Sequence, residues 1–228
     1  MSTIAENIST LRARIHNAAQ TAGRDPDSVG LLAVSKTKPA SDLRQAYEAG
    51  LRDFGENYLQ EALNKQGELS DLPLIWHFIG PIQSNKTRAI AEHFSWVHSV
   101  DRLKIAQRLS EQRPAGLPPL NICIQINISG EDSKSGCTPD DLPALAQAIS
   151  ALPNVTLRGL MAIPEPTDSH DEQNAAFAAV HALQTQLNLP LDTLSMGMSH
   201  DLEAAIAQGA TWVRIGTALF GARDYGQP

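Results

Sequence analysis

Short apolar runs alternate with segments of helical pattern along the whole chain, and this alternation limits the fold more than any other feature of the sequence. The first run, Leu31-Leu32-Ala33-Val34, is apolar at consecutive positions, which is typical of a strand buried on both faces in a parallel sheet. Candidate strands of this kind occupy residues 31–36, 52–57, 75–80, 95–100, 121–128, 157–163, 193–198 and 212–217. Helical patterns lie between them, near residues 40–50, 59–69, 84–93, 102–112, 140–151, 171–187 and 200–208. Strands that alternate with helices in this way predict a closed, TIM-type (β/α)₈ barrel; a doubly wound open sheet is the alternative, but it more often has fewer strands.

An extra helix is predicted ahead of the first strand, over residues 3–22. Apolar side chains recur there at helical spacing, at Ile4, Ile8, Leu11, Ile15 and Ala19. The chain of 228 residues contains no internal repeat and no Gly/Ser-rich or Pro-rich linker. This length and continuity predict one α/β barrel domain over residues 1–228.

Composition and charge exclude several classes of function. A net charge of −7 argues against a nucleic-acid surface, which needs clustered Lys and Arg. The amino terminus lacks the pattern of a signal peptide, and no apolar stretch approaches the roughly 20 residues of a membrane span. The only cysteines, Cys123 and Cys137, do not suggest a disulfide framework, and the histidines show no metal-ligand spacing. We therefore expect a cytoplasmic protein that binds neither nucleic acid nor membrane.

Lys36 follows the first apolar run and is the first candidate functional residue. In a parallel barrel, functional groups gather at the carboxyl ends of the strands. Polar residues do cluster at the ends of the predicted strands, whereas the strand interiors are expected to stay apolar. An amine must be neutral to form a Schiff base, and partial burial favours that form. The alternative is that Lys36, like the nearby Lys38, is a solvated loop lysine.

Further candidates lie at the ends of the last two predicted strands, where barrels frequently bind phosphate. Ser199 precedes the helical pattern of residues 200–208 in the N-cap position. Gly216 and Thr217 supply an open backbone and a hydroxyl. Each residue also has a structural explanation, because Ser199 could only cap its helix and Gly216 could only ease packing. Together, at adjacent strand ends, they favour a phosphate site.

Arg214 lies two residues before Gly216 and is predicted to share its face, pointing toward the barrel mouth. A charged guanidinium there needs an acceptor, either a pyridine nitrogen or a carboxylate such as Asp53 or Glu56. A lysine, an inward arginine and a phosphate cradle suit an aldehyde cofactor with a phosphate tail, and pyridoxal phosphate is the candidate. A donor at the ring nitrogen would leave that nitrogen unprotonated, which makes the ring a weak electron sink.

Longer motifs carry a resemblance to a known family. They are Ala33-Val34-Ser35-Lys36-Thr37-Lys38, Phe54-Gly55-Glu56-Asn57-Tyr58, residues 76–86 (WHFIGPIQSNK), Ser133-Lys134-Ser135-Gly136, residues 158–164 (RGLMAIP), residues 194–199 (LSMGMS), Val213-Arg214-Ile215-Gly216-Thr217 and Phe220-Gly221. Over essentially its whole length the chain resembles the pyridoxal phosphate homeostasis proteins. That vitamin B6-binding family is related to the barrel domain of alanine racemase and other fold-type III enzymes.

The resemblance implies a site and a function. Lys36 would carry pyridoxal phosphate as a Schiff base, Asn57 would lie beside the ring, and Arg214 would meet the pyridine nitrogen. Ser199, Gly216 and Thr217 would hold the phosphate. The implied function is a homeostasis or carrier protein that influences intracellular pyridoxal phosphate and amino-acid and keto-acid balance, without an established catalytic reaction and with no metal site.

Two other functions stay open. One is a single-domain fold-type III enzyme with weak amino-acid racemase activity, using Tyr58, His77 or Lys134 as base. The other is a barrel enzyme that forms a Schiff base between Lys36 and a sugar phosphate. Lys134 is also a candidate second amine in contact with the cofactor. For the carrier, we expect a monomer whose recipients are pyridoxal phosphate-dependent apoenzymes.

Overall fold

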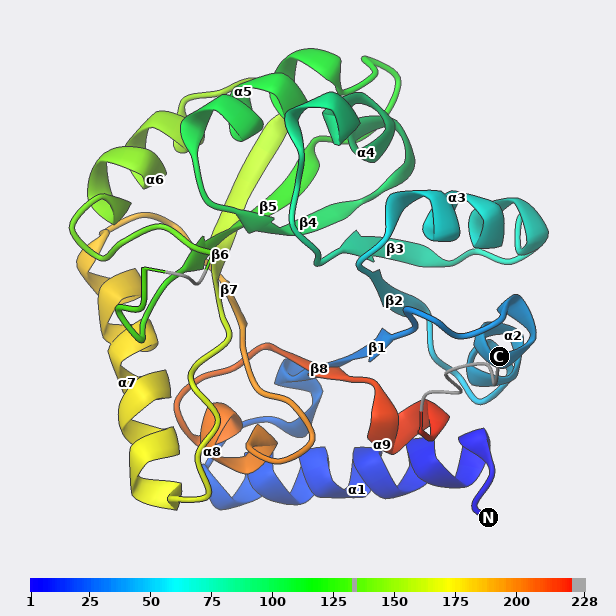
Figure 1. Cartoon of the computed structure of the whole chain (residues 1–228). Coiled ribbons are helices and arrows are strands. Elements are labelled where there is room, and N and C mark those ends of the chain that lie inside the picture. The colour runs from blue at the N-terminus through cyan, green and yellow to red at the C-terminus, as the bar shows by residue number, and fades with distance from the viewer. Residues whose placement is uncertain (133–134, 223–228) are drawn as a thin grey trace.

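The computed structural model describes residues 1–132 and 135–222, which form a closed barrel of eight parallel strands. The strands are β1 (Gly30–Val34), β2 (Asp53–Glu56), β3 (Ile75–Phe78), β4 (Trp96–Val100), β5 (Leu120–Ile126), β6 (Val155–Ala162), β7 (Thr193–Ser195) and β8 (Trp212–Ile215). Each strand pairs with the next along the chain, and β8 closes the ring on β1 with Leu32 opposite Arg214. Figure 1 shows the helices arranged around this ring. The predicted barrel is confirmed.

Helices follow the strands and cover the outside of the barrel. They are α2 (Ala40–Glu48), α3 (Leu59–Glu68), α4 (Thr87–His93), α5 (Leu103–Gln112), α6 (Leu142–Ser150), α7 (His170–Gln186), α8 (Leu202–Ala207) and α9 (Thr217–Phe220), with 3₁₀ turns η1 (Pro26–Ser28) and η2 (Ser84–Lys86). Several strands end earlier than predicted: β1 ends at Val34 and β7 at Ser195. Lys36 and Ser199 therefore lie in loops beyond the strands, where the backbone can approach a ligand.

The predicted first helix is α1 (Ile4–Thr21), which runs along the outside of the barrel beneath α8 and α9 (Figure 1). Thr3 and Glu6 form a capping box at its amino terminus. Its buried face carries Ile8, Leu11, Ile15 and Ala19. Asn7 Nδ2 donates to the carbonyl of Leu219 at 2.9 Å, so α1 also holds α9 in place.

The main hydrophobic core lies between the strands and the surrounding helices. The inside of the barrel is different, because buried polar side chains occupy several strands there. His77, His98 and Ser195 are fully buried, and Arg214 is 5% exposed. The expectation that strand interiors stay apolar is therefore wrong, and the polar residues are accommodated because they bond to one another across the barrel.

Within the described residues, no helix has both the length and the apolar character that crossing a bilayer requires. Cys123, in β5, and Cys137 are both buried free thiols. Burial raises the pKa of the Cys123 thiol to about 12 and that of Cys137 to about 11.

Candidate functional site

A cavity of about 290 Å³ opens at the carboxyl ends of the strands. All of the predicted site residues line it: Lys36, Asn57, Ser199, Arg214, Gly216 and Thr217. They come from four different strand ends, so the closed barrel is what brings them together. The other lining residues are Val34, Lys38, Ile79, Ile163, Met198, His200 and Gly221.

Lys36 lies in the turn after β1 and is partly buried. Both of its chain neighbours are bonded to helix α3. Lys65 Nζ donates to the carbonyl of Ser35 at 2.7 Å, and the backbone N–H of Thr37 donates to Glu61 Oε1 at 2.5 Å. Thr37 has φ +66°, a conformation that a β-branched residue adopts only when its surroundings enforce it. Helix α3 therefore fixes the backbone on both sides of Lys36.

Glu56 connects this turn to a buried ion pair. Its Oε1 accepts hydrogen bonds from Lys65 Nζ at 2.7 Å and from Ser35 Oγ at 2.8 Å. Burial raises the pKa of Glu56, and the ammonium of Lys65 acts in the opposite direction. Glu56 Oε2 is buried without a hydrogen-bond partner among the described residues. The ion pair of Glu56 is therefore with Lys65 and not with Arg214.

Asn57 presents an unpartnered acceptor beside the cavity. Its Oδ1 is buried, and nothing in the described part of the chain bonds to it. The backbone of Asn57 is held close to Gly80, where an added Cβ would lie 2.4 Å from the Asn57 carbonyl oxygen. A buried polar atom without a partner is costly. Such an atom on a cavity wall is therefore suited to a polar ligand.

Arg214 is buried in β8 and reaches the cavity. Its NH1 donates to Ser195 Oγ at 2.9 Å and its NH2 to the carbonyl of Ala162 at 3.0 Å. Burial lowers the pKa of Arg214 to about 10. No carboxylate of the described residues forms an ion pair with it, so the alternative pairing with Asp53 or Glu56 is wrong. Since a guanidinium carries five N–H donors, donors remain for a ligand.

The three candidate phosphate residues meet across neighbouring loops. Ser199 is not an N-cap as predicted: α8 begins later, with Asp201 as its N-cap, because Asp201 Oδ1 accepts from the backbone of Met198 at 2.7 Å and closes a turn there. Ser199 is instead held through its carbonyl, which accepts from Arg14 of α1 at 2.9 Å. Gly216 is the N-cap of α9, and Thr217 is its exposed first residue. A Cβ at Gly216 would lie 3.4 Å from the Val34 carbonyl oxygen, so packing alone does not require glycine.

Other polar residues from the sequence analysis lie elsewhere. Tyr58 is 53% exposed and is not part of the cavity wall, and His77 lies inside the barrel. Two further polar residues, Gln125 of β5 and Asn127 just after it, line an adjoining cavity of about 350 Å³, which shares Asn57 and Met198 with the first. Lys134 falls outside the described residues.

Two polar lining residues were not predicted. Lys38 Nζ donates to the carbonyl of Ala222 at 2.8 Å, and His200 Nε2 lies 3.5 Å from Asp201 Oδ2. The sequence did hold a signal for Lys38, because it lies two residues after Lys36 in the same segment at the end of the strand. The sequence held no such signal for His200, because the pattern there predicts the first turn of a helix.

Comparison with known proteins gives matches over nearly the whole chain. Residues 4–224 match the family model "Alanine racemase, N-terminal domain". The chain is 77% identical to the pyridoxal phosphate homeostasis protein of Pseudomonas aeruginosa, with 100% of this chain and 99% of the relative covered. It is 55% identical to the Escherichia coli protein of the same name, over 99% of each.

Solved structures agree with this relationship. PipY of Synechococcus elongatus, with pyridoxal phosphate bound, is 43% identical with a TM-score of 0.86, covering 96% of this chain and 100% of that one. Alanine racemase from Corynebacterium glutamicum shares the fold at 20% identity and a TM-score of 0.67, and this chain covers 62% of it. The family-model match and the high identity to full-length relatives agree: the chain belongs to the pyridoxal phosphate homeostasis protein family, built on the barrel of the alanine racemase N-terminal domain.

Proposed function

We propose that this chain binds pyridoxal 5′-phosphate and serves as a carrier that influences the intracellular supply of the cofactor and the balance of amino acids and keto acids. The observation that carries the proposal is the convergence of all the predicted binding residues on one cavity of about 290 Å³. PipY, a relative of similar length, was solved with this cofactor bound.

The residues present fit the chemical groups of the cofactor one by one. Lys36 supplies the amine for a Schiff base with the aldehyde, formed with loss of one water. Asn57 carries a buried polar atom that has no partner of its own within the described structure. Gly216 leaves its backbone uncovered by a side chain, and Ser199 and Thr217 line the same cavity with hydroxyls. Arg214 has unused donors for the pyridine nitrogen.

Arg214 also supports a role in binding rather than in catalysis. When bound, pyridoxal phosphate can supply an electron sink for reactions at the α-carbon of amino acids, and this requires a protonated or strongly polarised ring nitrogen. Arg214 is buried, donates through NH1 and NH2, and is the charged residue of β8 that reaches the cavity. A guanidinium donor at the ring nitrogen leaves that nitrogen without a proton, and demanding carbanion chemistry is disfavoured.

Two of the three candidate bases, His77 and Tyr58, give a second line of support. The ring nitrogens of His77 are bonded to Asp53 Oδ1 and His98 Nε2, each at 2.8 Å. Tyr58 is not part of the cavity wall. A missing or misplaced acid–base group reduces a rate by roughly 10²–10⁴-fold. We therefore propose a protein without a physiological catalytic reaction. We also propose that it is a cytoplasmic monomer whose recipients are pyridoxal phosphate-dependent apoenzymes.

The test is an absorbance spectrum of the purified protein with pyridoxal phosphate, before and after borohydride. A visible band that disappears on reduction, with a phosphopyridoxyl group on Lys36 in peptide fragmentation, is the expected result. Lys36→Ala should abolish the band, whereas the matched variant Lys38→Ala should retain it. A wild-type protein that stays colourless and unmodified with excess cofactor contradicts the proposal.

A separate measurement tests the absence of catalysis. The protein loaded with cofactor is incubated in deuterated water with each free amino acid, and exchange of the α-proton is followed by NMR. We expect no exchange above that of free pyridoxal phosphate. Exchange that depends on Lys36 would identify the chain as an enzyme instead.

A further inference from the structure

A chain of hydrogen bonds crosses the inside of the barrel from Asp53 to Arg214. Asp53 Oδ1 lies 2.8 Å from His77 Nε2, and His77 Nδ1 lies 2.8 Å from His98 Nε2. His98 Nδ1 lies 2.7 Å from Ser195 Oγ, which in turn accepts from Arg214 NH1 at 2.9 Å. The members come from β2, β3, β4, β7 and β8, so the chain spans the barrel.

Burial and neighbouring aromatic rings hold the hydrogen-bond chain in place. The two histidines and Ser195 are fully buried. The His77 ring stacks on Trp96 at 5.4 Å between centroids and meets the edge of Trp212 at 5.1 Å. Burial lowers the pKa of both histidines. The Asp53 carboxylate acts in the opposite direction on His77 without reversing the shift, whereas His77 and Arg214 lower the pKa of His98 further. Both rings are therefore neutral, each with one donor and one acceptor nitrogen.

Neutral rings leave only one direction for the hydrogens. The carboxylate of Asp53 only accepts, so His77 carries its proton on Nε2 and accepts at Nδ1. His98 must then donate from Nε2 and accept at Nδ1. The Ser195 hydroxyl consequently donates to His98, and its oxygen lone pairs face Arg214.

We propose that His77, His98 and Ser195 are positioning residues, which fix the guanidinium of Arg214 so that its remaining donors face the cofactor cavity. This inference rests on the proposed function, because it concerns how Arg214 meets the cofactor. It assigns a role to buried residues that do not line the cavity.

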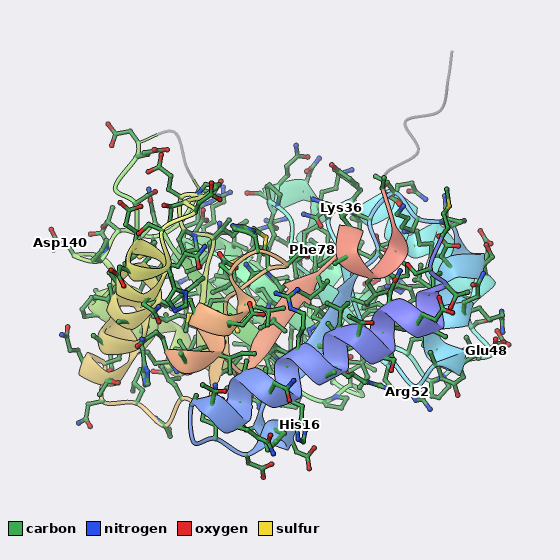
Figure 2. The ribbon with its side chains drawn as sticks, turned by 90° about the horizontal axis from the view of Figure 1, so that it is seen from below. His16, Lys36, Glu48, Arg52, Phe78 and Asp140 are labelled. Atoms are coloured by element: carbon green, nitrogen blue, oxygen red, sulfur yellow. The ribbon has the colours of Figure 1, made fainter. Side chains whose placement is uncertain are left out.

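Asp53, at the other end of the hydrogen-bond chain, lies at the end of the barrel opposite the cavity that Arg214 lines. Asp53 lines a cavity of about 390 Å³ together with Arg12, His16 and Arg52. Figure 2 shows His16 and Arg52 at the edge of the molecule away from Lys36. The proposal therefore links a carboxylate at the amino-terminal end of the strands to cofactor binding at the carboxyl-terminal end.

The first test needs no cofactor. In the wild-type protein labelled with ¹⁵N-histidine, the imidazole nitrogens of His77 and His98 are examined by NMR at about pH 7.5. We expect both rings as neutral Nε2–H tautomers. A charged ring, or an Nδ1–H tautomer at His98, would overturn the proposed direction of the chain.

The second test compares two buried serines. Ser195→Ala removes the acceptor of Arg214, whereas the control Ser99→Ala removes a buried hydroxyl that donates to the Gly80 carbonyl. Loss of one buried hydrogen bond predicts a dissociation constant for pyridoxal phosphate about tenfold higher in Ser195→Ala, with a shifted absorbance maximum. Ser99→Ala should stay within about twofold of wild type. Equal affinities and spectra for wild type and Ser195→Ala would refute the positioning role. A wild type that binds no cofactor would refute the proposed function instead.

Asp53 provides a variant far from the cofactor. Asp53→Asn keeps an oxygen that accepts from His77, whereas Asp53→Ala removes it. We expect Asp53→Ala to change the tautomers and to weaken cofactor binding several-fold, and Asp53→Asn to preserve the Nε2–H tautomers. Unchanged tautomers and affinity in Asp53→Ala would show that Asp53 does not set the direction of the hydrogen-bond chain.

Discussion

Lys65 Nζ donates a 2.7 Å hydrogen bond to the carbonyl oxygen of Ser35, the residue immediately before Lys36. The same ammonium pairs with Glu56 at 2.7 Å and with Glu61 at 2.8 Å. Its side chain is only 6% exposed, so it bonds where water scarcely competes. Lys65 thus holds the loop that carries Lys36, the proposed cofactor anchor, without lining the cavity itself.

Replacing Lys65 with methionine should therefore affect both stability and binding. Lys65→Met leaves the buried Glu56 carboxylate without its cation, which predicts a loss of about 3 kcal/mol in the free energy of unfolding. The loosened turn should also slow formation of the Lys36 adduct. Urea unfolding of the apoprotein and the rate of appearance of the visible band measure the two effects.

The double variant Lys65→Met/Glu56→Gln separates charge from packing. It removes both charges, so much of the lost stability should return if the single variant suffers from an unpaired carboxylate. Additive losses in the two single variants would show that the ion pair is not the cause.

Gly216→Ala tests the phosphate site. The added Cβ would make only ordinary contacts with Val34, so the free energy of unfolding should change by less than about 1 kcal/mol. Binding of pyridoxal phosphate should weaken about tenfold, whereas binding of pyridoxal, which lacks the phosphate, should change little. Titrations with both compounds measure the difference, and an equal loss for both would contradict a phosphate role for Gly216.

Gly67→Ala is the matched control for that substitution. Gly67 is exposed in α3, and a Cβ there meets nothing within 4 Å. Gly67 lies in the last turn of α3, so alanine there should stabilise the protein by no more than roughly 0.5–1 kcal/mol and leave both titrations unchanged.

Asn57→Ala should weaken cofactor binding without lowering stability, unlike Lys65→Met, which should affect both. It removes a buried oxygen that has no partner in the described structure, so the free energy of unfolding of the apoprotein should not fall. Cofactor affinity should fall about tenfold, because the side chain lines the cavity proposed to hold the ring. A destabilised apoprotein with normal affinity would show that Asn57 serves the fold and not the cofactor.

Stability should decrease with falling pH. The folded protein keeps His77 and His98 neutral because burial lowers their pKa, whereas both take up a proton in the unfolded chain below about pH 6.5. The unfolded state then binds more protons, so stability is lost as pH falls from about 6.5 toward the folded-state pKa values. The limiting slope is about 1.4 kcal/mol per pH unit for each histidine. Urea unfolding of the apoprotein at several pH values would show a flat profile if these rings protonated in the folded state.

The fold could be predicted because its determinants are local. Runs such as Leu31–Val34 identify buried strands, and the spacing of Ile8, Leu11 and Ile15 identifies the first helix. The strand-end rule then gathers Lys36, Arg214 and Gly216 without any knowledge of distances, whereas Asn57 was expected from the family resemblance. Their common cavity follows from barrel closure.

The polar chain inside the barrel could not be predicted, since its partners are far apart in sequence. His98 and Ser195, for example, are 97 positions apart and meet only because β4 and β7 face each other across the interior. The helix start at Ser199 was wrong for a local reason. Asp201, two residues later, is equally suited to the N-cap, and only the turn it forms with Met198 decides between them.

The pairing of β8 with β1 has a consequence for the order of events during synthesis. The cavity straddles this seam, with Val34 and Lys36 on one side and Arg214, Gly216 and Thr217 on the other. On the ribosome, the segment that bears the amine emerges long before the segment that bears the guanidinium. If these residues bind the cofactor together, loading must wait until β8 has been made and has paired with β1. A nascent chain, however well its early helices form, should be unable to retain the vitamin.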